Sequence, residues 1–202
     1  MKVIGLTGGS GAGKSEVSRY MQNRYGVVHI DGDTIARHVT DTRRDCLDEL
    51  TDHFGAAILN PDGTLNRKAL AALAFSSGEQ TAALNRITHK YITREINSLI
   101  ARSRSAGAPA VAVDGAAIIE SGTARDCDAV IAVIAPYARR LRAIMARDGI
   151  DEAQARQRLD AQKPDAWYTA HADYTIENTG TLEALQRQVD MVMNGILKPE
   201  DS

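Results

Sequence analysis

Aromatic residues are scarce in this 202-residue chain, and neither sign of charge dominates it. Because only 4% of the residues are aromatic, we expect a core built mainly from Ala, Val, Ile and Leu. The formal net charge of −2 offers no basis for binding nucleic acid through bulk electrostatics. We therefore predict no nucleic-acid partner.

Cysteine and long apolar runs are also rare. Cys46 and Cys127 lie far apart without C-x-x-C spacing, which is more typical of two separate thiols than of a disulfide and fits a cytoplasmic protein. The first apolar run ends at Thr7, too early for a signal-peptide core, and no later stretch approaches the length of a membrane span. We predict a cytoplasmic protein without membrane association.

Five short apolar runs are rich in β-branched residues and do not alternate with polar ones. They are Lys2–Thr7, Val27–Ile30, Ala110–Val113, Ala129–Ile134 and Tyr174–Ile176. Such runs are typical of strands buried on both faces of a parallel sheet. Helical patterns separate them, including one near the C-terminus that Thr181 is placed to cap. The pattern predicts an α/β fold, a parallel sheet flanked by helices.

Two longer segments interrupt this core. Residues 35–109 have a mostly helical pattern and are too long for one crossover, so they predict a helical subdomain. Residues 136–171 contain many arginines on a predicted helix–turn–helix that is broken at Asp148-Gly149. This pattern makes the segment a candidate mobile lid. The nucleotide-binding core of this single domain would then comprise residues 1–34, 110–135 and 172–202.

The glycine cluster after the first predicted strand matches one specific sequence motif in full. Gly8, Gly13, Lys14 and Ser15 satisfy G-x-x-x-x-G-K-[ST] between a strand and a helix, the pattern of a phosphate-binding P-loop. A dinucleotide turn is excluded because Lys14 stands where its third glycine belongs. The predicted nucleotide-binding residues of this loop are Gly8, Gly9, Ser10, Gly11, Ala12, Gly13, Lys14 and Ser15.

A P-loop predicts a nucleoside triphosphate with Mg²⁺. Backbone N–H groups turn inward around phosphate oxygens, Lys14 reaches the β- and γ-phosphates, and the Ser15 hydroxyl ligates the metal. GTPases, ATPases and small-molecule kinases all share this loop. A GTPase needs an N/T-K-x-D motif to bind its base. The nearest match in this chain, Thr42–Asp45, has Arg in place of Lys, which argues against a GTPase.

Carboxylates follow two other predicted strands. Asp31 and Asp33 come after the second, at the edge where ligands gather in open parallel sheets. Asp33 either caps a helix that begins at Thr34 or orients an acceptor hydroxyl, and Asp31 either assists or holds Mg²⁺ through water. Asp114 follows the third strand, as a Walker B acid in the metal site or as part of an Asp-Gly turn.

Several stretches together resemble the dephospho-CoA kinase family over most of the chain. They are IGLTGGSGAGKS, HIDGDTIARHV, LNRKALAALAF, LNRITHKYI, IIESG, IMARDGIDEAQARQRLDAQKPD and ADYTIENTG. The resemblance implies a P-loop kinase fold, similar to nucleoside-monophosphate kinases, with a helical acceptor-binding subdomain at 35–109 and an Arg-rich lid at 136–171. It also implies transfer of phosphate from ATP to the ribose 3′-hydroxyl of dephospho-CoA, the last step of coenzyme A biosynthesis.

The resemblance also implies roles for single residues. Asp33 falls at the position of the family's catalytic base, Arg140 on the lid near the ATP phosphates, and Asn178 in the loop near the adenine. Arg67 and His89 fall on the side that binds dephospho-CoA. We expect a monomer or a weak homo-oligomer.

The chain departs from the family pattern at several positions: Glu16 in place of Thr, Lys90 in place of Pro, Ala143 in place of Arg, and Ala116, Ala117 and Ile118 in place of Pro-Leu-Leu. These replacements bear on the acceptor pocket and lid closure more than on the reaction type. Two alternatives remain open: a kinase of another small acceptor, such as a nucleoside or nucleotide, and a nucleotide-binding module that has lost catalysis.

Overall fold

The computed structural model describes residues 1–115, 118–119 and 122–198 of the chain. Ala116 and Ala117, two of the three residues that stand in place of the family's Pro-Leu-Leu, lie outside the described residues. So do the last residues of the core segment predicted at 172–202.

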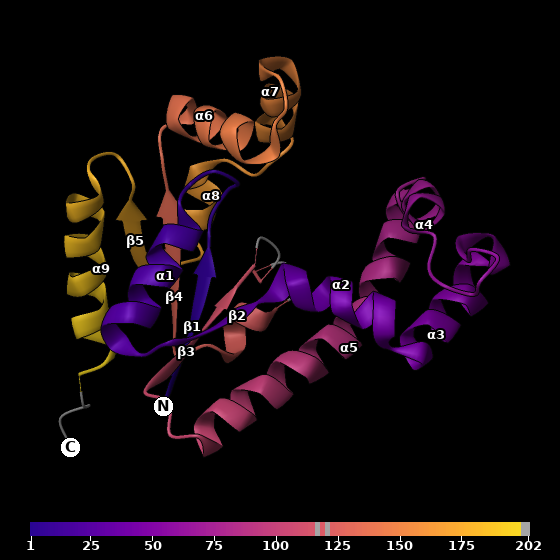
Figure 1. The fold of residues 1–202 in the computed structure, drawn as a ribbon, viewed down its shortest axis with the longest axis horizontal. Helices are drawn as coiled ribbons and strands as arrows, with labels where there is room; N and C mark the ends of the chain where they lie inside the picture. The colour runs from indigo at the N-terminus through magenta and orange to yellow at the C-terminus, as the bar shows by residue number, and fades with distance from the viewer. Residues whose placement is uncertain (116–117, 120–121, 199–202) are drawn as a thin grey trace. The chain divides into compact units, whose positions relative to one another are not determined.

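Each of the five predicted runs forms a strand, and the ends agree within one residue. The strands are β1 (Lys2–Thr7), β2 (Val28–Asp31), β3 (Ala110–Asp114), β4 (Ala129–Ile134) and β5 (Tyr174–Glu177). Their order in the sheet is β2-β3-β1-β4-β5 (Figure 1). β1 pairs in parallel with both β3 and β4, and β4 pairs in parallel with β5. The predicted α/β class and parallel sheet are therefore confirmed.

The central strand is buried on both faces, which explains its unbroken apolar sequence. Ile4 and Leu6 of β1 are fully buried among side chains of α1 (Lys14–Tyr25), α9 (Leu182–Ile196) and the neighbouring strands. Thr181 caps α9, as predicted, by accepting a hydrogen bond from the Ala184 N–H. Because the strand order reverses on either side of β1, the loop after β1 opens at the point where parallel sheets bind ligands.

The chain divides into two compact units, Met1–Ile30 with Ile100–Ser202, and Asp31–Leu99. The first unit holds the sheet together with the helices α1, α6 (Tyr137–Asp148), α7 (Glu152–Asp160), α8 (Asp165–Thr169) and α9 and the short 3₁₀ segment η2 (Thr123–Asp126). α6 ends at Gly149, whose φ of 64° only glycine adopts without strain, and Asp151 then caps α7. The predicted helix–turn–helix break is thus present.

The second unit is helical. Its elements are α2 (Gly32–Thr42), α3 (Arg44–Phe54), the 3₁₀ segment η1 (Ala56–Ile58), α4 (Arg67–Ala74) and most of α5 (Gly78–Ser105). An antiparallel bridge between Leu59 and Leu65 closes the turn at residues 60–63. The buried side chains of the second unit include Leu50, Ile58 and Leu70. The boundaries predicted for a helical subdomain at 35–109 and a lid at 136–171 stay predictions.

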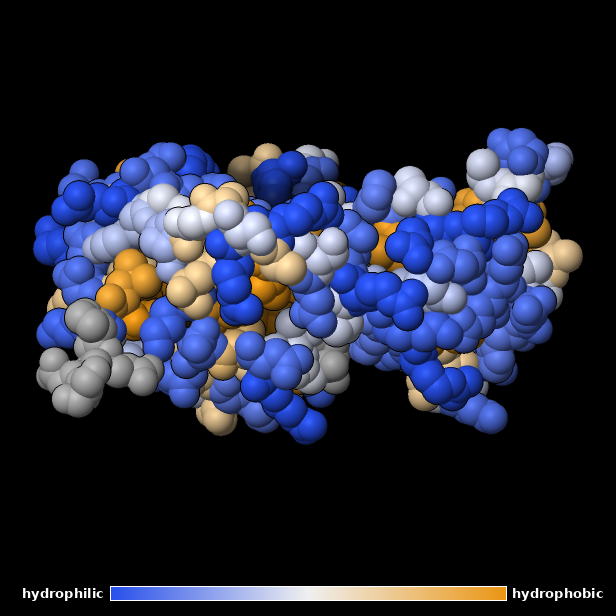
Figure 2. Space-filling model, turned by 90° about the horizontal axis from the view of Figure 1, so that it is seen from below, coloured by the Kyte–Doolittle hydropathy of each residue, from blue (hydrophilic) through white to orange (hydrophobic). Residues whose placement is uncertain are grey.

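The surface carries few large apolar side chains. Hydrophilic residues dominate the face shown in Figure 2, with apolar residues in small groups between them. Within the described ranges, none of the helices combines the length and the apolar character that crossing a bilayer requires. Cys46 and Cys127 are both free thiols, and burial raises the pKa of each to about 11.

Candidate phosphate-binding site

The glycine motif forms a tight loop between β1 and α1. Gly13 is the N-cap of α1 and has φ 104° and ψ 18°, in the left-handed region that side-chain-bearing residues avoid. A Cβ atom at this position would also overlap the amide nitrogen of Asn178. Both the backbone conformation and the close packing therefore require glycine here. The loop presents the positive end of α1, where anions bind favourably.

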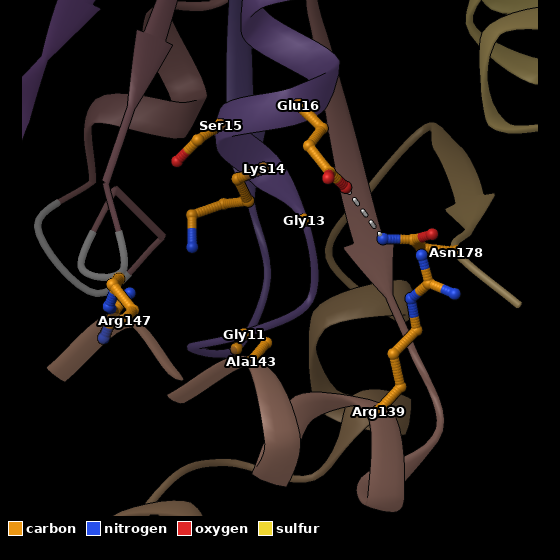
Figure 3. Close-up of a pocket in the computed structure, with 10 residues that line it drawn as sticks. Gly11, Gly13, Lys14, Ser15, Glu16, Arg139, Ala143, Arg147 and Asn178 are labelled. Carbon is orange, nitrogen blue, oxygen red and sulfur yellow. Dashed lines mark hydrogen bonds between the residues drawn. The ribbon is translucent and has the colours of Figure 1, made fainter. Parts of the chain in front are cut away.

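A pocket of about 290 Å³ opens above this loop (Figure 3). Its lining residues are Gly9, Gly11, Gly13, Lys14, Ser15, Glu16, Arg139, Ala143, Arg147 and Asn178. In the view of Figure 3, Lys14, Ser15 and Arg147 lie on one side of the loop, and Glu16, Asn178 and Arg139 on the other. Three basic side chains around one carboxylate make the pocket suited to a polyanion.

Lys14 lines the pocket and contacts the glycine loop, and its predicted role at the phosphates stays a prediction. Its ammonium group donates a hydrogen bond to the Gly8 carbonyl at 2.9 Å, across the mouth of the loop. Ser15 follows on the first turn of α1 and lines the same pocket. The loop thus brings one cation and one hydroxyl to the place where a bound phosphate meets the helix end.

Two arginines of α6 line the pocket, Arg139 and Arg147, with Ala143 between them at intervals of four residues. Residues four apart share one helix face, so these three form a single stripe. Arg147 donates to the Ser10 hydroxyl at 3.1 Å and pairs with Asp148, and this hydrogen-bonded pairing raises the pKa of Arg147. Arg139 donates to the Gly180 carbonyl at 3.1 Å.

Arg140 occupies a different position from its two neighbours. Its side chain is buried, with 6% of the residue exposed, and it is absent from the pocket lining. Its guanidinium donates to the Ser10 carbonyl at 3.1 Å, to Gln162 at 2.9 Å and to Asp165 at 2.9 Å. In this structure Arg140 therefore contacts the loop itself, and the predicted contact with ATP phosphates stays a prediction.

Asn178 lies after β5 and is 2% exposed. Its side-chain amide donates to the Ala12 carbonyl at 3.0 Å and to the Glu16 carboxylate at 3.4 Å (Figure 3). The amide oxygen is buried without a hydrogen-bond partner among the described residues. Asn178 therefore contacts the glycine loop at Ala12 and also Glu16, which motif spacing had not singled out. Its predicted place near the adenine stays a prediction.

The carboxylates at the ends of β2 and β3 have different surroundings. Asp31 is the N-cap of α2, accepting hydrogen bonds from the Thr34 N–H at 3.0 Å and the Thr34 hydroxyl at 2.7 Å. Helix α2 begins at Gly32 rather than at Thr34, so Asp33 is in its first turn and is not its cap. Asp114 is half-buried, 3.5 Å from the imidazole of His29, and outside the pocket lining.

The residues predicted to bind the acceptor belong to the second unit. Arg67, the first residue of α4, donates to the Arg37 carbonyl at 3.1 Å, to the Thr40 hydroxyl at 2.9 Å and to Asp41 at 2.7 Å. His89 on α5 is half-buried, and this burial lowers its pKa. Both side chains are held on the helical unit that also carries Asp33.

Four lining residues lay outside the predicted site: Glu16, Arg139, Ala143 and Arg147. The spacing of Arg139, Ala143 and Arg147 on one helix face was the available signal, but it does not show which face meets the loop. Among residues 1–115, 118–119 and 122–198, no cluster of three or more His, Cys, Asp or Glu side chains is arranged to hold a metal ion.

Comparison with known proteins shows which family this chain resembles along its length. The family model for dephospho-CoA kinase matches residues 2–184. The dephospho-CoA kinase of Corynebacterium efficiens is 42% identical over 194 residues, which cover 96% of both chains.

Two solved structures extend the similarity to the fold. A Thermus thermophilus protein of known structure is 31% identical, with a TM-score of 0.80 over 96% of this chain and 97% of its own. The structure of dephospho-CoA kinase from Campylobacter jejuni is 25% identical, with a TM-score of 0.68 over 96% of both chains.

Proposed function

Because this chain belongs to the dephospho-CoA kinase family, we propose that it transfers the γ-phosphoryl group of ATP to the ribose 3′-hydroxyl of dephospho-CoA. The products are CoA and ADP, and the reaction is the last step of CoA biosynthesis. The observation that carries this proposal is the family match over residues 2–184, which includes the entire P-loop and the arginine-bearing helix α6.

The donor side of the reaction is assigned to the pocket above the loop. Backbone N–H groups of the loop and the positive end of α1 hold the phosphates of ATP, and Lys14 neutralises charge that develops during transfer. Arg147 and Arg139 add two further positive charges from α6. Asn178 supports the nucleotide side of the pocket through its contacts with Ala12 and Glu16.

The oxygen ligands that the protein offers suit an Mg²⁺ ion that is held mainly by the phosphates of ATP. Mg²⁺ usually takes one or two protein oxygens and completes its shell with phosphate oxygens and waters. The hydroxyl of Ser15, which lines the pocket, would supply such an oxygen, and Asp114 would hold the water shell. When bound, the metal supplies charge neutralisation at the phosphates.

The acceptor side is assigned to the helical unit. Asp33 orients the 3′-hydroxyl of dephospho-CoA and takes its proton late in the transfer, while Arg67 and His89 bind the remainder of the acceptor. Asp31 rather than Asp33 is the N-cap of α2, which is consistent with this assignment.

A coupled assay of ADP release, with and without dephospho-CoA, tests the proposed function. We expect ADP release that depends on dephospho-CoA and a product phosphorylated once on the ribose. The same assay with a panel of nucleosides and nucleotides identifies a kinase of another acceptor. Tight ATP binding without turnover of any acceptor would instead indicate a module that has lost catalysis.

Replacing Glu16 by glutamine is expected to lower the KM for ATP. Glu16 places a carboxylate in a pocket built for an anion, whereas glutamine keeps the shape and still accepts a hydrogen bond from Asn178. Loss of one like charge should lower KM by about threefold at low salt, and by less as salt screens the pocket. Steady-state kinetics at two ionic strengths measure this effect.

Glu183→Gln is the matched control for this change, because Glu183 also lies in the first turn of a helix and is exposed. It should leave the KM for ATP unchanged at both salt concentrations. An E16Q protein with an unchanged or higher KM would contradict the idea that the Glu16 charge opposes ATP binding.

A further inference from the structure

Ser10, in the middle of the phosphate loop, is contacted by three side chains from the Arg-rich part of the chain. Its backbone N–H donates to the Gln162 side-chain oxygen at 2.7 Å, and its carbonyl accepts from Arg140 at 3.1 Å. Its hydroxyl accepts from Arg147 at 3.1 Å. Both backbone groups of one loop residue are therefore held by side chains more than a hundred residues away in sequence.

These side chains also hold one another. The Gln162 oxygen that accepts from Ser10 accepts a second hydrogen bond from Arg140, at 2.9 Å. Arg140 in turn pairs with Asp165 at 2.9 Å, and the Gln162 amide nitrogen donates to the Arg158 carbonyl at 3.1 Å. The Arg140 side chain is only 8% exposed, whereas that of Asp165 is 34% exposed, so the hydrogen bonds at Arg140 are the part of the network best shielded from solvent.

The packing at Gly9 shows how closely this network approaches the loop. A Cβ atom at Gly9 would overlap the Arg140 guanidinium and would lie 2.9 Å from the Gln162 oxygen. A side chain at this position would therefore displace the ends of the Arg140 and Gln162 side chains. The loop and the network therefore have complementary shapes, in addition to their hydrogen bonds.

We propose that Gln162 and Arg140 are positioning residues that hold Ser10 and fix the phosphate loop in its ATP-binding geometry. The side-chain oxygen of Gln162 links the loop to Arg140, because it accepts hydrogen bonds from both the Ser10 N–H and the Arg140 guanidinium. This inference rests on the proposed use of the loop to bind ATP. It assigns Arg140 to the loop backbone and leaves the pocket itself to Arg139 and Arg147.

Gln162→Met is the variant that tests this proposal, because methionine keeps the length of the side chain and lacks the oxygen. Without that oxygen the Ser10 N–H and one Arg140 donor lose their partner, and the loop leaves its binding geometry. We expect the Kd for ATP, measured by calorimetry, to rise about tenfold. The KM for dephospho-CoA should change little, and the midpoint of thermal unfolding should fall but stay well above the assay temperature.

Two further variants complete the design. Gln162→Glu restores an oxygen acceptor and should return the Kd for ATP to within about twofold of the wild-type value. Gln157→Met is the matched control, since Gln157 is an exposed glutamine on the neighbouring helix α7, and it should leave the Kd for ATP unchanged.

The proposal is overturned if Q162M binds ATP as tightly as Q157M. It is equally overturned if Q162M fails to fold or if Q162E binds ATP as poorly as Q162M, because the glutamine would then serve packing rather than loop position. Calorimetry measures ATP binding without phosphoryl transfer. A wild-type protein that binds ATP but does not phosphorylate dephospho-CoA would therefore overturn the proposed function and leave this test intact.

Discussion

Replacing Lys14 by methionine should lower kcat by about a hundredfold to a thousandfold, the loss typical of removing one preorganised charge at a reacting group. Methionine keeps most of the aliphatic stem, so the loop should remain packed. What disappears is the ammonium group that donates to the Gly8 carbonyl and lies in the pocket beside Ser15. Steady-state and single-turnover kinetics with ATP and dephospho-CoA measure the effect on the chemical step.

Lys68→Met is the control for this change, because Lys68 is an exposed lysine of α4 in the helical unit. It should leave kcat near the wild-type value. ATP binding by K14M should weaken much less than kcat falls, since the loop N–H groups and two arginines still face the phosphates. Wild-type turnover by K14M would contradict the assignment of this loop as the catalytic phosphate site.

Asp33→Asn is expected to lower kcat by about a hundredfold or more, while the Kd for ATP stays unchanged. Asparagine keeps the size of the side chain but is a far weaker acceptor for the proton of the attacking hydroxyl. Because Asp31 caps α2, the helix should remain intact in this variant. Kinetics with dephospho-CoA, calorimetry with ATP and thermal unfolding together separate chemistry from binding and stability.

Asp31→Ala provides the contrasting variant. It removes the cap that accepts from the Thr34 N–H and hydroxyl, so it should lower the free energy of unfolding by about 1 kcal/mol. D33N should leave that free energy close to the wild-type value. Near-normal turnover by D33N would contradict the proposal that Asp33 orients the acceptor hydroxyl and takes its proton.

These two aspartates show where sequence pattern is ambiguous. Both follow the same strand and both are preferred helix-capping residues, so a cap at Asp33 and a helix start at Thr34 were reasonable expectations. In the structure the strand continues to Asp31 and the helix begins at Gly32. The residue at which the helix begins depends on where the hydrogen-bonded pairing of β2 ends. A local pattern of residue types does not determine that position.

The phosphate loop and the sheet were predictable because their causes are local. A strand buried on both faces needs an unbroken apolar run, as in β1, and each of the five runs became a strand. A loop that turns its N–H groups inward needs glycine at particular positions, and Gly13 has the left-handed conformation that this requirement implies. Residue type and spacing carry such information without reference to distant parts of the chain.

The division of labour among the arginines was decided by tertiary structure. Arg139, Arg140 and Arg147 belong to one helix, and their composition alone does not distinguish them. Packing of α6 against the loop buries Arg140 against Ser10 and Gln162 and turns Arg139 and Arg147 toward the pocket. The sequence by itself determined the sheet and the loop, since backbone requirements are local. The partner of each charged side chain depends on which helix face meets the loop, and only the folded chain settles that.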